Sequence, residues 1–130
     1  MRKHVFALGC LLALAAAALP ARAENLELEL DTDFGPLTLK LDLEARTVSG
    51  TYPKFDGQIL GTLSEDGSLI RGVWLQPKGD HRCPQPNLGK SYWGNVAFTY
   101  PNRPLPGEHL RGRWGYCGAT PSEAWNGVFR

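Results

Sequence analysis

Two neighbouring segments carry the clearest structural signal in this chain: LRGRWGYC at residues 110–117 and, after a short loop, WNGVFR at residues 125–130. Side chains alternate between the two faces of a β-strand, so Gly112 and Trp114 share one face while Arg111 and Arg113 share the other. The first segment is therefore predicted to be a strand with one face against an apolar core and one face in water.

The same alternation runs through most of the chain after residue 23. Leucine alternates with charged or polar residues at 26–31 and again at 37–43, a pattern of period two that excludes an amphipathic helix. Ser64-Glu65-Asp66-Gly67 is the clearest hairpin turn, with Gly67 free to take a positive φ. We expect eight strands, at about residues 26–31, 37–43, 47–52, 58–63, 68–76, 91–100, 108–117 and 124–130.

Eight short antiparallel strands joined mostly by short turns favour a single all-β domain, an up-and-down barrel. Closure of the sheet removes the exposed edges that an open sheet would leave. A β-sandwich is the alternative. Glycine recurs two residues before or after an aromatic residue, as in Gly72-Val73-Trp74, and we expect a ring from a neighbouring strand to fill the space beside such glycines.

The first 23 residues resemble a secretory signal peptide. Arg2 and Lys3 precede an apolar run of leucine and alanine, and small residues at 21–23 suit a signal peptidase. Cleavage would leave a β-barrel domain at residues 24–130 in the periplasm or secreted. A membrane span and a lipoprotein anchored through Cys10 are weaker alternatives, because the apolar run is short and only a few apolar residues precede Cys10.

Cys83 and Cys117 are the two cysteines that remain after such cleavage. An even pair in an exported chain predicts a disulfide, which would stabilise the domain by roughly 3–4 kcal/mol. The rival interpretation is a pair of free thiols. The predicted bond would pin the one long loop, residues 77–90, against the strand at 108–117.

Charge is unevenly distributed along the domain. Residues 24–66 hold 10 acidic and 3 basic side chains, whereas residues 67–130 hold 3 and 8. The total of −2 does not indicate a nucleic-acid partner, and no membrane association is expected after cleavage. We expect acidic residues of the first strand (Glu27, Glu29 and Asp31) to face arginines near the closing seam (Arg111, Arg113 or Arg130). These arginines could also form a patch for an acidic partner, but the sequence favours a solvated face that balances the acidic first half.

The polar residues do not indicate catalysis. His81 and His109 are not spaced as metal ligands, and both are expected at the surface. Asp80, His81 and Ser91 could be drawn as a hydrolytic triad, but no nucleophile-elbow sequence accompanies them. We therefore predict no catalytic residue, no metal and no cofactor.

Aromatic residues are the better candidates for function. Tyr52, Trp74, Trp114 and Trp125 could line the mouth of the barrel and bind a flat or apolar small molecule, since an eight-stranded barrel can hold one small ligand. Phe98, Tyr116 and Phe129 are also expected to point inward. The pattern of rings by itself favours the other interpretation, that this ring volume simply fills the interior.

Ser49-Gly50-Thr51-Tyr52 and the later Gly-x-Trp strands resemble the avidin/streptavidin barrels and, more loosely, other calycin-like barrels. They also resemble uncharacterised exported bacterial proteins with the same Gly-x-Trp ending. The resemblance implies a barrel and places Tyr52 where these proteins use a tyrosine to bind the ureido group of biotin. The first strand lacks the family's Gly-x-Trp-x-Asn segment, so we infer the architecture but not biotin.

Two functions follow as hypotheses. One is a small-molecule binding barrel. The other is a protein-interaction or inhibitor module that docks the loop at 77–90 into a partner, as rigidified loops do at low entropic cost.

Overall fold

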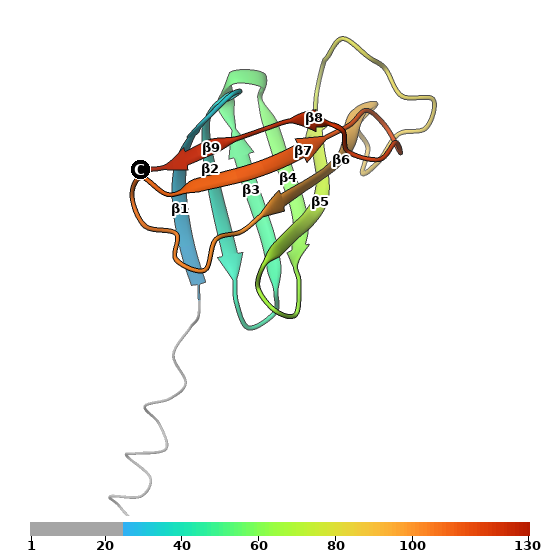
Figure 1. Ribbon diagram of the computed structural model, residues 1–130. Coiled ribbons are helices and arrows are strands. Elements are labelled where there is room, and N and C mark those ends of the chain that lie inside the picture. Colours follow the sequence, from blue (N-terminus) through green and yellow to red (C-terminus); the bar gives the residue numbers. More distant parts are fainter. Residues whose placement is uncertain (1–24) are drawn as a thin grey trace, which may run out of the picture.

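The structure, a computed structural model, describes residues 25–130, and the predicted signal peptide at 1–23 lies outside them. The described chain forms one antiparallel sheet that is closed on itself (Figure 1). Its elements are β1 (Asn25–Thr32), β2 (Gly35–Asp42), β3 (Thr47–Tyr52), the 3₁₀ turn η1 (Pro53–Phe55), β4 (Gly57–Leu63), β5 (Leu69–Gln76), β6 (Tyr92–Thr99), β7 (His109–Trp114), β8 (Glu123–Ala124) and β9 (Gly127–Phe129).

Closure of the sheet depends on the last strands. Each strand from β1 to β6 pairs with the strand that follows it in the chain. β9 closes the sheet, because it pairs with both β7 and β1. The two-residue β8 pairs only with β7 and stands outside the resulting eight-stranded barrel. The predicted up-and-down barrel is thus confirmed, and the β-sandwich alternative is wrong because the sheet runs unbroken around the molecule.

The two segments at the end of the chain are less regular than predicted. β7 ends at Trp114, and Cys117 takes a positive φ of 57°. The predicted strand at 124–130 is divided into β8 and β9 at Asn126. There the Asn126 side chain accepts a hydrogen bond from the Gly112 amide at 3.2 Å, and the Asn126 amide donates to the Asp33 carboxylate at 2.8 Å. Hydrogen bonds between a backbone amide and a side-chain oxygen thus take the place of two backbone hydrogen bonds between strands.

The inward-facing side chains of the strands form a continuous apolar core inside the barrel. Exclusion of these side chains from water is the main force that holds the closed sheet together. The most completely buried of them are Leu30, Leu37, Leu39, Leu41, Tyr52, Ile59, Ile70, Val96, Phe98 and Leu110.

Inward-facing glycines make room for neighbours, though the neighbour is not always a ring. A Cβ atom at Gly112 would overlap the Phe98 ring and lie 2.6 Å from the Trp125 carbonyl oxygen, so the expected ring is present there. Gly61 and Gly72 lie directly opposite each other in β4 and β5. At this pair the space is taken by the backbone of the facing strand, because the two strands approach too closely for any side chain. The expectation of a neighbouring ring is therefore wrong for this pair.

The predicted hairpin turn between β4 and β5 is confirmed, with a φ of 78° at Gly67. The Asp66 carboxylate accepts hydrogen bonds from the Ser68 hydroxyl at 2.7 Å, the Ser64 hydroxyl at 2.8 Å and the Ser68 amide at 3.0 Å. These bonds, above all the one from the Ser68 side chain, favour the charged form and lower the pKa of Asp66 to about 2.

A carboxyl whose pKa is lower in the folded than in the unfolded state stabilises the fold above its ordinary pKa of about 4, and this contribution is lost as pH falls towards 2. We expect Asp66→Asn to lower the free energy of unfolding at neutral pH and to match the wild type near pH 2. Urea unfolding across this pH range measures the difference. Glu65→Gln, beside it in the same turn, is the control, and parallel pH profiles for wild type and Asp66→Asn would contradict the prediction.

The seam where β9 meets β1 carries the predicted charge pairs, but through one arginine only. Arg130 forms hydrogen bonds to Asp31 at 2.8 and 3.0 Å and lies 3.9 Å from Glu29, while Glu27 pairs with Lys40. Hydrogen bonding to Asp31, together with the negative charge of Asp31, raises the pKa of Arg130. The prediction is confirmed for Arg130 and wrong for Arg111 and Arg113, which form no salt bridge within residues 25–130.

Candidate functional site

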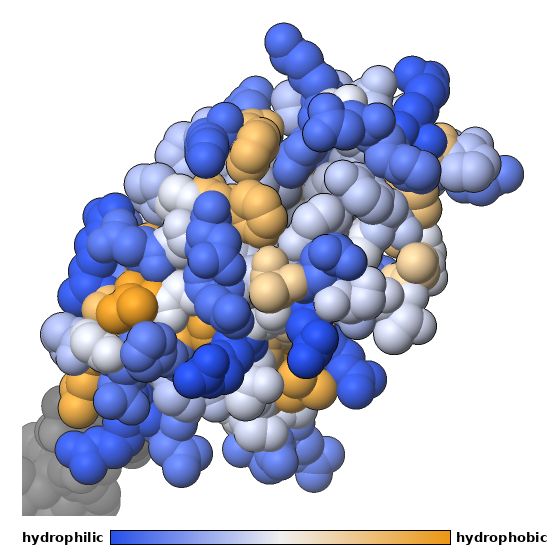
Figure 2. Space-filling model, turned by 45° about the horizontal axis from the view of Figure 1, so that its top comes forward, coloured by the Kyte–Doolittle hydropathy of each residue, from blue (hydrophilic) through white to orange (hydrophobic). Residues whose placement is uncertain are grey.

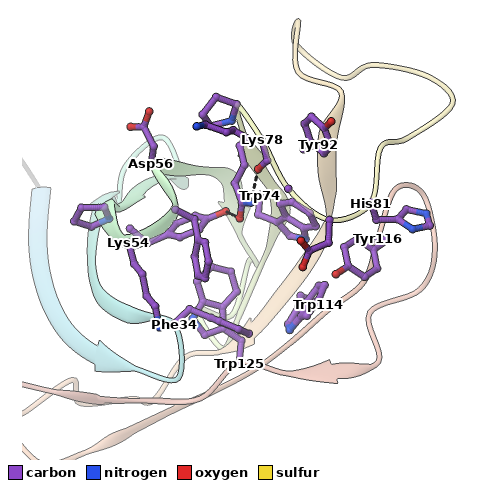
Figure 3. Close-up of a pocket in the computed structure, with 17 residues that line it drawn as sticks. Phe34, Lys54, Asp56, Trp74, Lys78, His81, Tyr92, Trp114, Tyr116 and Trp125 are labelled. Atoms are coloured by element: carbon purple, nitrogen blue, oxygen red, sulfur yellow. Dashed lines mark hydrogen bonds between the residues drawn. The ribbon is translucent and has the colours of Figure 1, made fainter.

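One end of the barrel opens into a cavity of about 600 Å³, which we call the cup (Figure 3). Its wall comes from the turn after β1, the end of β3 with η1, the end of β5 with the start of the following loop, and the segments after β7 and β8. The lining residues are Phe34, Tyr52, Pro53, Lys54, Phe55, Asp56, Trp74, Gln76, Pro77, Lys78, Gly79, Asp80, His81, Tyr92, Trp114, Tyr116 and Trp125.

All four residues predicted to bind a ligand line the cup. Tyr52, Trp74 and Trp125 are at most 5% exposed and form its floor, while Trp114 is half-buried in its wall. Phe98 and the buried aliphatic side chains fill the interior of the barrel away from the cup, whereas these four aromatic residues border open space. That they bind a ligand there stays a prediction.

The other three aromatic predictions have a mixed outcome. Phe98 and Phe129 are buried in the core, as expected. Tyr116 faces the cup, where its ring contacts Trp74 and Trp114, but it is 37% exposed at the rim and is not part of the buried core. β7 ends at Trp114, so Tyr116 lies beyond the last residue of the strand.

The rings form a continuous lining with near-perpendicular contacts. Centroids are 5.0 Å apart for Tyr52 and Trp125, 5.9 Å for Trp74 and Trp114, and 4.9 Å for Trp114 and Tyr116. The planes of these three pairs are inclined at 76°, 82° and 84°. Edge-to-face geometry of this kind is favourable between aromatic rings and holds each ring in one orientation.

Hydrogen bonds fix the polar ends of the floor residues. Trp74 Nε1 donates to the Gly115 carbonyl at 3.1 Å, and Trp125 Nε1 donates to the Thr32 hydroxyl at 3.0 Å. The Tyr52 hydroxyl donates to Gln76 Oε1 at 3.0 Å. Burial raises the pKa of Tyr52, so this hydroxyl stays protonated and remains a donor.

Sequence reasoning missed Phe34 and Phe55, which lie in the turns after β1 and β3 and contact each other with centroids 6.1 Å apart. A signal for them was available. In an up-and-down barrel the turns after odd-numbered strands meet at one end, so aromatic residues in those turns gather around one mouth.

Charged groups at the mouth are balanced. Lys54 and Lys78 contribute two cations and Asp56 and Asp80 two anions. His81 is exposed, as predicted, and stacks on Tyr116 with centroids 4.8 Å apart. Within residues 25–130 there is no group of three or more histidine, cysteine, aspartate or glutamate side chains that could hold a metal ion.

The disulfide anchors the rim of the cup. Cys83 and Cys117 are bonded, with Cα atoms 5.5 Å apart, which confirms the predicted pair. Cys117 lies in the segment after β7, so the bond ties the long loop to this segment and not to the strand itself. Backbone bonds support the junction, because the Cys83 amide donates to Ser91 and the Cys117 amide to Trp93, both at 2.8 Å. A disulfide is typical of a non-reducing environment.

The long loop rises above the barrel (Figure 1), and its first residues, 77–81, line the cup. Figure 2 turns this side forward and shows apolar side chains in small groups among hydrophilic ones, without one broad apolar patch. Across the described part of the chain, no helix has the length and apolar character needed to cross a membrane. None of the protein-family models, curated proteins or solved structures that were compared with the chain matches it.

Proposed function

We propose that this protein is an exported binding barrel whose cup holds a flat, largely apolar small molecule and carries out no catalysis. The observation that carries the proposal is the cup itself, a cavity of about 600 Å³ with a rigid aromatic lining above a filled core. Pockets for small ligands commonly have volumes of roughly 300–1,000 Å³ and are lined by apolar side chains with a few polar groups.

The chemistry of the lining supports this ligand class. Ring faces and edges favour stacking with a flat molecule, and burial of apolar surface would supply most of the affinity. Gln76 and the charged side chains of the mouth would orient polar groups of the ligand near the opening. Because the floor rings are already fixed by hydrogen bonds, binding would require little further ordering.

Two further features support the proposal. The disulfide agrees with the signal peptide predicted from the sequence and with a periplasmic or secreted location. The resemblance to avidin/streptavidin barrels favours the same class of function. In this chain the Tyr52 hydroxyl donates to Gln76, so a ligand that used Tyr52 as these barrels do would have to replace that contact.

The fluorescent dye 1-anilinonaphthalene-8-sulfonate is a suitable probe, since it is aromatic and its emission rises in an apolar site. We expect the folded wild-type protein to bind it. Phe55→Ala and Tyr116→Ala should each weaken binding about tenfold, because each removes a ring contact. Both rings are about two-fifths exposed, so their loss should leave the fold intact. Dye titration gives the affinities, and thermal unfolding confirms that the variants are folded.

Leu60→Ala is the matched control, because Leu60 is as exposed as Phe55, at 41%, but lies outside the cup. Unchanged dye binding in both ring variants would overturn the proposal. The second candidate is protein docking through the long loop, which carries Leu88, 67% exposed, in the turn between Asn87 and Lys90. Dye binding that is lost in Leu88→Ser but kept in the ring variants would favour this loop.

A further inference from the structure

Three arginines lie together on the outer face of β5 and β7, away from the cup. Arg71 in β5 and Arg111 and Arg113 in β7 are exposed, and each alternates with inward residues of its strand. The arginine patch predicted from the sequence consisted of Arg111, Arg113 and Arg130. In the structure Arg130 stands apart from the other two, because it pairs with Asp31 at the seam between β9 and β1.

Strand register fixes how the three arginines are spaced. Arg71 pairs with Ala97 in β6, and Ala97 pairs with Arg113 in β7, so one row across the sheet reads arginine, alanine, arginine. Neighbouring strands are about 4.8 Å apart, which places the ends of this row roughly 10 Å from each other. Arg111 and Arg113 are alternate residues of one strand and lie about 7 Å apart.

A groove of about 840 Å³ runs across this face. Ala97, Ala124 and two glycines line it, and they leave space between the arginine side chains. One wall is formed by residues 120–122, which hydrogen bonds hold in place: the Ser122 amide donates to the Trp114 carbonyl at 2.9 Å, and Arg113 Nη1 to the Ser122 carbonyl at 3.4 Å. The full lining is Leu69, Arg71, Gly72, Asn95, Val96, Ala97, Thr99, Arg111, Gly112, Arg113, Thr120, Pro121, Ser122, Ala124 and Asn126.

The groove has three positive charges and no acidic residue in its lining. Within residues 25–130 none of the three arginines forms a salt bridge, although the nearby seam pairs Arg130 with two carboxylates. Like charges held this close repel one another, and an anion bound between them would relieve the repulsion. The planar guanidinium group matches a carboxylate in a two-pronged hydrogen bond.

We propose that this groove binds an extended acidic peptide segment of another protein, with carboxylates at alternate positions. Alternate side chains of an extended chain repeat about every 7 Å, which equals the spacing of Arg111 and Arg113. Arg71 then meets a third carboxylate across the Ala97 row. Within residues 25–130, β5 and β7, the strands that carry the arginines, are paired on both sides, so recognition by the arginines depends on side chains and not on strand addition. This site is independent of the cup.

The probe is a short synthetic peptide in which glutamate alternates with serine, labelled with a fluorophore and titrated by anisotropy. We expect saturable binding to the wild-type protein that weakens as salt is added. A peptide with the same composition but its glutamates in one block should bind several-fold more weakly, and one with glutamine in place of glutamate should not bind.

Arg71→Gln and Arg113→Gln should each weaken binding of the alternating peptide about tenfold. Arg113→Lys should restore only part of the affinity, because lysine keeps the positive charge but cannot form the two-pronged hydrogen bond of the guanidinium group. Arg103→Gln, an exposed arginine outside the groove, is the control and should bind as the wild type does. Dye binding in the cup should stay unchanged in all four variants.

Three results would overturn the proposal: equal binding of the alternating and blocked peptides, an equal loss in Arg103→Gln, or tight binding of a sulfated oligosaccharide without binding of the alternating peptide. The last result would assign the groove to an anionic polysaccharide.

Discussion

Trp125→Ala should lower the free energy of unfolding by about 3–5 kcal/mol, the usual cost of removing a buried tryptophan. Trp125 is 3% exposed and contacts three rings, with centroids 5.0 Å from Tyr52, 5.3 Å from Phe34 and 5.4 Å from Phe98. It therefore joins the floor of the cup to the core below. Small domains have a total stability of about 5–15 kcal/mol, so this one change removes a large part of it. Urea unfolding followed by circular dichroism measures the effect.

Trp93→Ala is the matched control. Trp93 is half-buried on the outward face of β6, outside both the core and the cup, and donates one hydrogen bond to the Gln85 carbonyl. Its loss should cost only about 1–2 kcal/mol, since less apolar area returns to water. If Trp93→Ala were the more damaging substitution, the outer packing of the long loop, and not the floor of the cup, would hold the domain together.

Removal of the disulfide by Cys83→Ser with Cys117→Ser should destabilise the domain by about 3–4 kcal/mol. The two cysteines are 34 positions apart in the chain, and without the bond the unfolded chain gains the entropy of that open loop. The long loop and the segment after β7 meet at this bond, so the rim of the cup should also loosen. We expect dye affinity to fall several-fold at a temperature where the barrel is still folded.

Reduction of the wild-type protein provides the control for the disulfide. Wild-type protein in reductant should unfold at the same urea concentration as the double variant, and the variant itself should not respond to reductant. Equal stability of oxidised and reduced wild-type protein would show that the bond contributes nothing to the fold. Thiol titration of denatured, unreduced protein of residues 24–130 should find no free thiol.

The local pattern was enough to predict the barrel. Leucines at alternate positions of β1 and β2, and the glycine and proline residues between strands, identified the strands, because a period of two places one set of side chains in the core and is visible without any tertiary contact. The same reasoning placed Tyr52, Trp74 and Trp125 inside the barrel. The pairing of Cys83 with Cys117 followed from there being only two cysteines after the predicted signal peptide.

Three features were decided by contacts that no local pattern contains. β8 and β9 separate where the Asn126 side chain accepts a hydrogen bond from the Gly112 amide and the Asn126 amide donates to the Asp33 carboxylate. β7 ends at Trp114, and Tyr116 lies at the rim of the cup. Aromatic rings from elements far apart in the chain meet edge to face above the leucine-rich core and line the open end of the barrel. Arg71 joins Arg113 across Ala97 because strand register, which is set by pairing along the whole sheet, brings together residues 42 positions apart in the chain.

The sequence by itself determined the strands, their inward faces and the disulfide partners, since these depend on alternation and composition. Only the tertiary structure decided where the strands stop, which end of the barrel stays open and which arginines share a face, since these depend on pairs of residues far apart in the chain.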